Sequence, residues 1–258
     1  MQWKALGTMV GSWNMLVYGT GMYVMEKISG DEKPNHSRLA FFFYFLGLTN
    51  LMFNWGHHTY IVPAAPWIKT VAYIISITEL LILGYIILQW RQTLTNARKN
   101  YHIIPYRILS FADAWIFLNL ILAIAISVPA WNYYTHGTHI TVAHAMGATI
   151  GINTMILFAS VFYILQNENP VAMEKKRKWI GTGILVSNIA LLFFWVSLLG
   201  SGLVKMAGKI NNKTFYTIML ECKPWFQVFA YSGVIIMIGL IMMIIPAIKM
   251  ANAREKVL

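Results

Sequence analysis

Residues 226–248 read FQVFAYSGVIIMIGLIMMIIPAI, an apolar stretch that contains no Lys, Arg, Asp or Glu. An α-helix rises about 1.5 Å per residue, so a helix of this length crosses the ~30 Å hydrocarbon core of a bilayer. Lipid offers the backbone no hydrogen-bond partner, whereas a helix satisfies its backbone groups internally. The stretch therefore predicts a membrane-spanning helix, and with it the class of the fold.

The composition of the whole chain agrees with this interpretation. Hydrophobic residues make up 58% of the 258 residues and charged residues 11%. The charged fraction is less than half of the roughly 25% that is typical of soluble domains, which excludes a soluble globular enzyme, a disordered chain and a fibrous repeat. The net charge of +11 fits basic loops on one membrane side better than nucleic-acid binding. Cys222 is the only cysteine, so the sequence holds no disulfide framework.

Hydrophobic segments of about 20 residues recur along the chain, each long enough to cross a bilayer. We predict seven of them, at roughly 5–26, 39–60, 67–90, 108–130, 141–165, 179–204 and 226–248. The predicted fold is all-α, a polytopic membrane helical bundle with seven transmembrane helices. We expect residues 1–258 to form a single transmembrane domain.

Basic side chains sort the predicted loops into two groups. Fourteen of the 20 Lys and Arg residues fall in four regions, at 27–38, 91–107, 175–178 and 249–256. These regions alternate with loops that contain fewer Lys and Arg residues. Because cytoplasmic loops are enriched in Lys and Arg, we predict the N-terminus outside and the C-terminus in the cytoplasm. The basic loop after the sixth segment is the exception, since it lies on the predicted outer side. There we expect an anionic group or a partner to face Lys205, Lys209, Lys213 and Lys223.

Five of the seven histidines share the predicted outer side of the membrane. They are His57 and His58 at the end of the second segment, with His136, His139 and His144 around the start of the fifth. Neutral imidazole is the commonest metal ligand in proteins. A histidine at a helix end is also often a hydrogen-bonding residue of the membrane interface. Spacing alone leaves both a metal or haem site and an interfacial role open.

The roles of the remaining polar residues are predicted from their positions in the spans and loops. Glu79 lies in the middle of the third span, where it serves either as a structural hydrogen-bonding group or as a proton relay. Asp113 lies nearer the inner end of the fourth span, where we expect an anchor at the interface. We expect His36 and His102, which fall in inner loops, to be solvated surface residues.

Two stretches resemble the large subunit of bacterial nitric oxide reductases, members of the haem-copper oxidase superfamily. Gly56-His57-His58, followed by Pro66-Trp67 and then Glu79, resembles helices VII and VIII of that subunit. The stretch HGTHITVAHAMGATIG at 136–151 resembles its helix X. The resemblance covers nearly the whole chain. It matches helices VI to XII of the family, and so implies half of a haem-copper oxidase subunit I fold.

The resemblance also implies a role for each matching residue. His57 and His58 would bind a non-haem iron, or a copper in its place, and His144 would be the axial ligand of a high-spin haem b. Glu79 would lie near this dinuclear centre and deliver protons. The resemblance further implies the bacterial inner (cytoplasmic) membrane, an electron donor that is either cytochrome c or quinol, and NO as substrate.

Three positions depart from the pattern of the family. Leu6 and Val10 occupy the places of a third iron-binding histidine and of a glutamate. Met146 stands where the family has the histidine of the low-spin haem, and it is either a thioether ligand of that haem or a packing residue. Another membrane subunit would have to supply the missing helices, or else the chain has lost part of the site.

Three functions remain open from the sequence. The chain is a subunit of a nitric oxide reductase-like complex that reduces NO to N2O, or it is a non-catalytic membrane subunit for assembly or electron transfer with a degenerate fold. The third function is an oxygen-reducing terminal oxidase. Such oxidases use a tyrosine linked to a histidine, and neither Tyr60 nor Tyr73 stands at a position that the resemblance assigns to that role.

Overall fold

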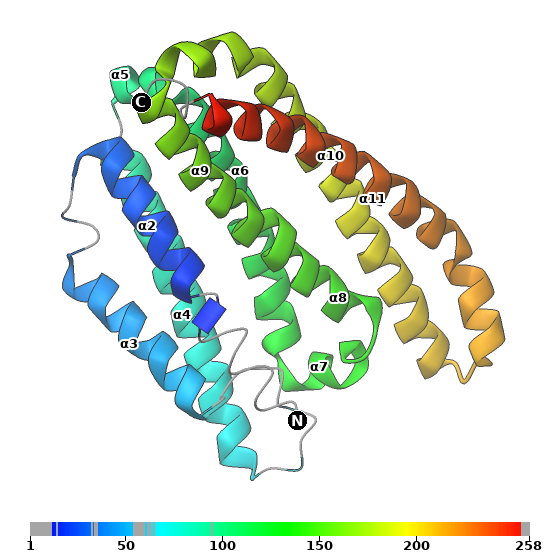
Figure 1. Cartoon of the computed structure of the whole chain (residues 1–258). Helices are drawn as coiled ribbons and strands as arrows, with labels where there is room; N and C mark the ends of the chain where they lie inside the picture. The colour runs from blue at the N-terminus through cyan, green and yellow to red at the C-terminus, as the bar shows by residue number, and fades with distance from the viewer. Residues whose placement is uncertain are drawn as a thin grey trace. The chain divides into compact units, whose positions relative to one another are not determined.

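The structure is a computed structural model that describes residues 12–13, 15–31, 33, 36–53, 60, 63, 65–93 and 95–253. In these residues the regular secondary structure consists of helices, without a strand. In chain order the helices are α2 (Met15–Ser29), α3 (Arg38–Phe53), α4 (Pro66–Thr93), α5 (Asn96–Tyr101), α6 (Ile103–Ser127), α7 (Pro129–Thr135), α8 (His139–Met146), the π-helix η3 (Gly147–Thr154), α9 (Met155–Glu168), α10 (Pro170–Ile210) and α11 (Phe215–Asn252) (Figure 1). The all-α class predicted from the sequence is confirmed.

Five helical segments in the described ranges are long and apolar enough to cross a membrane. They are Pro66–Gln92, Ile103–Ser127, His139–Glu168, Pro170–Ile210 and Phe215–Asn252, and they correspond to the last five predicted segments. The first two predicted segments contain α2 and α3, of 15 and 16 residues. Residues 1–11 and 54–59, at the ends of these segments, lie outside the described residues. Seven spans therefore stay a prediction.

The helices α10 and α11 extend well beyond the apolar segments that predict them. With 41 residues, α10 is about 62 Å long. It begins at Pro170 because the Asn169 side chain caps the helix, accepting a hydrogen bond from the Ala172 amide at 3.0 Å. The cluster 175–178, expected in a loop, therefore lies in the first turns of α10.

The lysines that we predict on the outer side likewise lie in helices or form an ion pair within the chain. Lys205 and Lys209 lie on α10, and Lys223 lies on α11. Lys213, in the turn between the two helices, forms a 2.6 Å ion pair with Glu221. From the sequence we expect an anionic group to face these lysines. For Lys213, this group is the Glu221 carboxylate of the same chain.

The chain divides into two compact units. The first consists of residues 1–101 and 113–136, and the second of residues 102–112 and 137–258. The helix α6 contributes its first ten residues to the second unit and the remainder to the first.

In the first unit, buried side chains tie α4 to the helices around it. Phe43 of α3 packs on Ile82 and Ile86 of α4 in an apolar core cluster. The buried Trp90 indole of α4 donates a hydrogen bond to the Met25 carbonyl of α2 at 2.9 Å. These contacts hold both α2 and α3 to α4.

The first unit also contains an ion pair that corrects the expectation for Asp113. Its side chain is 1% exposed rather than placed at an interface, and its Oδ2 accepts a 3.0 Å hydrogen bond from Arg91 Nε. Because an isolated buried carboxylate is costly, Arg91 is what allows Asp113 to lie inside the unit. The pair joins the C-terminal end of α4 to α6.

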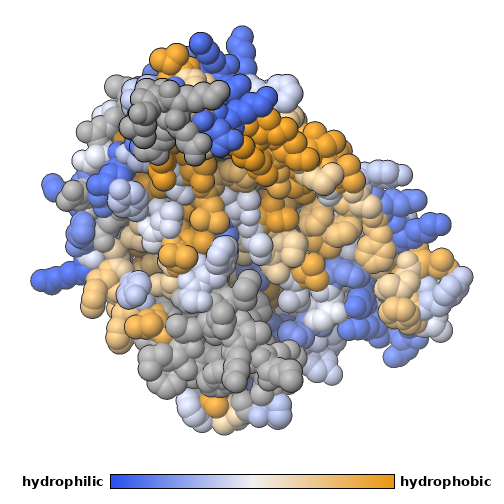
Figure 2. Space-filling model, viewed as in Figure 1, coloured by the Kyte–Doolittle hydropathy of each residue, from blue (hydrophilic) through white to orange (hydrophobic). Residues whose placement is uncertain are grey.

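In the second unit, α10 and α11 form a long antiparallel hairpin (Figure 1). Glycines bring the two backbones together, since a Cβ at Gly239 would lie 2.6 Å from the Ser187 amide nitrogen and one at Gly183 would lie 2.9 Å from the Gly239 carbonyl oxygen. Apolar side chains gather on the outward surface along α11, with polar and charged side chains near its ends (Figure 2). This distribution suits a helix that faces lipid.

We expect Gly239→Ala to lower the free energy of unfolding by about 1–3 kcal/mol, because the added methyl would collide with backbone atoms of Ser187 that cannot rotate away. Gly233→Ala is the matched control on the same helix. Its Cβ would meet only the Phe194 ring, at an ordinary distance of 3.6 Å. Unfolding by detergent titration measures both variants. Equal stability of the two would contradict the close packing at Gly239.

We expect a Lys176→Cys variant to react with a membrane-impermeant thiol reagent only after the membrane is opened. The position lies in the first turns of α10, on the predicted cytoplasmic side, and the native Cys222 is buried and does not compete. Lys213→Cys, in the turn at the other end of α10, should react in intact cells. Reaction of the residue-176 variant in intact cells would overturn the predicted orientation.

Candidate cofactor site

The helix α8, which carries His144, begins at a defined turn. Gly137 has a φ of +70°, a left-handed conformation that glycine adopts without strain. The next residue, Thr138, caps α8 by accepting a hydrogen bond from the Ile140 amide at 3.3 Å. Lys205 of α10 holds the turn, because its ammonium group donates to the Gly137 carbonyl at 2.9 Å. The turn thus fixes where α8 starts on the surface of α10.

One face of α8 is buried, and His144 lies beside it. Ile140, Ala143 and Gly147 are buried. On α10, the absence of a side chain at Gly202 allows the close approach, since a Cβ there would lie 2.5 Å from the Ile140 amide nitrogen. His144 is partly exposed. Packing against α10 therefore fixes the helix while leaving part of the imidazole accessible.

These surroundings fit an axial haem ligand. A haem has to reach the imidazole over a surface without bulky groups, and the neighbouring Ala145 is exposed. Ala143 and Gly147, the other small neighbours of His144, serve packing instead. A neutral imidazole is a common proximal ligand of haem iron. His144, which is partly exposed, and Ala145, which is exposed, are the positions of α8 that a haem would have to reach.

A π-helix follows the candidate ligand directly, which sequence reasoning did not predict. The segment η3 covers Gly147–Thr154, and the Thr154 hydroxyl donates to the carbonyl of Thr149, five residues earlier, at 2.9 Å. Such segments occur frequently at functional sites, because the wider turn re-aims the side chains that follow. The glycines at 147 and 151 are the only sequence signal for it. Met146, the last residue of α8, lies about 200° around the helix from His144.

The structure locates the other predicted site residues only in part. Glu79 lies in the middle of α4, as predicted, although its side chain lies outside the described part of the chain. His57 and His58 lie outside the described residues, as do Leu6 and Val10. Glu79 belongs to the first unit and His144 to the second. Within the described ranges, no three His, Cys, Asp or Glu side chains gather into a metal site.

The remaining histidines have structural surroundings of their own. His136 follows α7 as its C-cap residue, and the His139 ring contacts Phe226 edge-on, with 5.1 Å between ring centroids. His36 is exposed, as expected. The expectation for His102 was wrong, because its ring is partly buried beside Tyr163 at a centroid distance of 5.2 Å. Burial lowers the pKa of His102 below its ordinary value.

A comparison with known protein families finds a match that covers most of the sequence. Residues 1–235 match the family described as cytochrome C and quinol oxidase polypeptide I. The matched range includes the double histidine at 57–58, α4 with Glu79, and α8 with His144. The all-helical structure and its long apolar helices agree with this match. The chain therefore belongs to the cytochrome c and quinol oxidase polypeptide I family, that is, to the haem-copper oxidase superfamily.

Proposed function

We propose that the chain is a subunit of a nitric oxide reductase-like complex in the bacterial inner membrane. The reaction joins two NO molecules with two electrons and two protons to give N2O and water. The observation that carries the proposal is His144, a partly exposed imidazole that α10 holds in place through α8. It occurs within the stretch 136–151, which resembles the haem-binding helix of nitric oxide reductases.

Each predicted residue has a defined task in this proposal. His144 holds the iron of a high-spin haem b through one ring nitrogen, and its second ring nitrogen needs a hydrogen-bond acceptor that fixes the tautomer. His57 and His58 hold a second metal, iron or copper. A haem held by His144 and a metal held by His57 and His58 would supply the redox chemistry of the reaction. Glu79, in the middle of α4, holds a proton and passes it toward this centre.

Two histidines do not complete a metal coordination sphere, so further ligands are required. We propose that a water, a carboxylate or a residue of a second membrane subunit provides them. The subunit would also connect the chain to its electron donor, cytochrome c or quinol. We place the N-terminus outside and the C-terminus in the cytoplasm, in accordance with the basic regions at 27–38 and 175–178.

A specific observation favours a second candidate function, that of a non-catalytic membrane subunit for assembly or electron transfer. Leu6 and Val10 stand at the positions where nitric oxide reductases have a metal-binding histidine and a glutamate. Neither side chain can bind a metal. Haem binding and metal binding, measured separately, distinguish the two functions.

We expect His144→Ala to abolish the high-spin haem spectrum of the purified complex together with NO reduction, because alanine offers the iron no ligand. Met146→Ala is the matched control on the same helix and should keep the high-spin signal, since residue 146 lies on a different side of α8. Optical and electron paramagnetic resonance spectra measure the haem. A normal five-coordinate haem in the His144→Ala variant would reject this assignment.

We expect His57→Ala and His58→Ala each to remove the second metal while the helix content stays unchanged. His136→Ala is the control, because this residue is also on the predicted outer side but follows the short helix α7. Elemental analysis of the purified complex gives metal per haem, and circular dichroism gives the helix content. Undiminished metal and NO turnover in both of the first two variants would remove the dinuclear centre from the proposal.

A further inference from the structure

The second unit carries two exposed cationic side chains that come from different helices. They are Arg107, near the start of α6, and Lys178, in the first turns of α10. Both stretches belong to the second unit. They meet at Gly181, where a Cβ would lie 3.7 Å from Arg107 Nη1. Because residues three apart are neighbours on a helix surface, Arg107 and Lys178 flank the position of Gly181, which has no side chain.

The charge at this place is not balanced by the chain. In the part of the chain that the structure describes, the ion pairs include neither Arg107 nor Lys178. Glu174, the acidic residue nearest to Lys178 in the sequence, pairs with Arg177 at 3.2 Å. Residues 170–181 contain three Lys, one Arg and this one Glu. An anion between Arg107 and Lys178 would balance the excess of positive charge.

The position of Lys178 along α10 places this excess of charge at the level of lipid headgroups. Residues 179–204, which follow it, contain no Lys, Arg, Asp or Glu. A basic side chain at the end of such a segment extends toward the membrane interface, where the phosphates of the lipids lie. The adjacent Trp179 is 55% exposed, and tryptophan is enriched at the same level of a membrane.

An apolar surface continues from Lys178 along the same face of α10. Four exposed residues follow at intervals of four, three, four and three: Thr182, Leu185, Ile189 and Leu192. The Thr182 hydroxyl donates a hydrogen bond to the Lys178 carbonyl at 3.0 Å, so its polar group is satisfied within the helix. A free phosphate ion would use the cations alone. A phospholipid would also cover the apolar residues with an acyl chain.

We propose that Arg107 and Lys178 bind the phosphate of one anionic phospholipid, with an acyl chain along Leu185 and Ile189. The Arg107 guanidinium can donate two parallel hydrogen bonds to phosphate oxygens, and the Lys178 ammonium adds a second positive charge. The Gly181 position leaves room for the phosphate between them. The inference does not depend on the proposed function, because it involves neither the haem nor the second metal.

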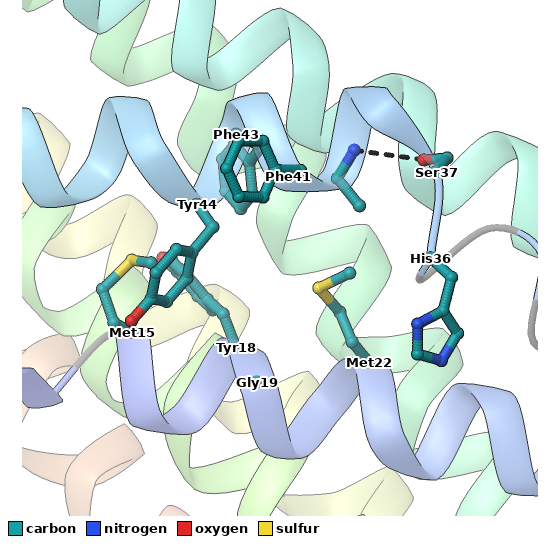
Figure 3. A pocket seen from close by; sticks show the side chains of 10 residues that line it. Met15, Tyr18, Gly19, Met22, His36, Ser37, Phe41, Phe43 and Tyr44 are labelled. Atoms are coloured by element: carbon teal, nitrogen blue, oxygen red, sulfur yellow. Dashed lines mark hydrogen bonds between the residues drawn. The ribbon is translucent and has the colours of Figure 1, made fainter.

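A pocket of the first unit serves as an internal control for lipid binding. It lies between α2 and α3 and has a volume of about 390 Å³ (Figure 3). Its lining consists largely of methionine and aromatic side chains, and the residues that line it include neither Lys nor Arg. A lipid chain that enters this pocket meets no basic side chain, so its binding there should not depend on the charge of the headgroup.

The test uses the full chain in lipid nanodiscs with two photoreactive lipids that have the same acyl chains, a phosphatidylglycerol and a phosphatidylcholine. Mass spectrometry locates the label. We expect phosphatidylglycerol to label residues 181–192 more strongly than phosphatidylcholine does, whereas the two lipids should label α2 and α3 equally. Inorganic phosphate should not compete. Equal labelling of 181–192 by both lipids, or displacement by inorganic phosphate, would overturn the proposal.

Charge variants identify the residues that bind the headgroup. We expect Arg107→Gln and Lys178→Gln each to weaken labelling by phosphatidylglycerol about fivefold, the usual effect of one Lys or Arg on an anionic headgroup. Lys178→Arg should retain it. Lys176→Gln is the matched control, because it removes the same charge about 200° around α10 from Lys178. Equal losses in Lys176→Gln and Lys178→Gln would reduce the effect to net charge and refute the inference.

Discussion

The need to satisfy backbone hydrogen bonds in the absence of water constrains this molecule most strongly. Within a hydrocarbon layer each unsatisfied amide or carbonyl costs several kcal/mol, so every crossing segment has to be a helix. Polar side chains inside the units then need partners from neighbouring helices. Asp113 has Arg91, and the Trp90 indole has the Met25 carbonyl. The positions of the helices depend on which hydrogen-bond partner each of these few polar groups has on a neighbouring helix.

Hydropathy predicted which parts of the chain form long helices, but not where these helices end. The predicted sixth segment covers 179–204, whereas α10 runs from Pro170 to Ile210. Helix ends are set by capping groups such as Asn169, and a helix continues into water as long as its backbone bonds and side chains permit. The partner of Asp113 was missed for a related reason, because Arg91 is 22 residues away and no local pattern connects them.

For the candidate site, residue types and their spacing pointed to a small set of residues, and the structure added the surroundings of some of them. Spacing placed His144 near the start of the fifth predicted span and Glu79 in the middle of the third, and both positions hold in the helical segment His139–Glu168 and in α4. Spacing did not predict the π-helix after Met146. Hydrophobic periodicity does not distinguish the hydrogen bonds of a π-helix, which join residues five apart, from those of an α-helix, which join residues four apart.

The length of α10 has a consequence for the membrane in which the chain works. Lys178 and Lys205 bound the uncharged middle of this helix and lie about 40 Å apart along it. That spacing is close to the thickness of a bilayer with its headgroups, about 40–45 Å. The distance between the two ammonium groups therefore matches the thickness of one bilayer. In a thinner membrane a tilt of the α10–α11 hairpin accommodates this spacing, whereas a thicker membrane draws a lysine toward the hydrocarbon layer.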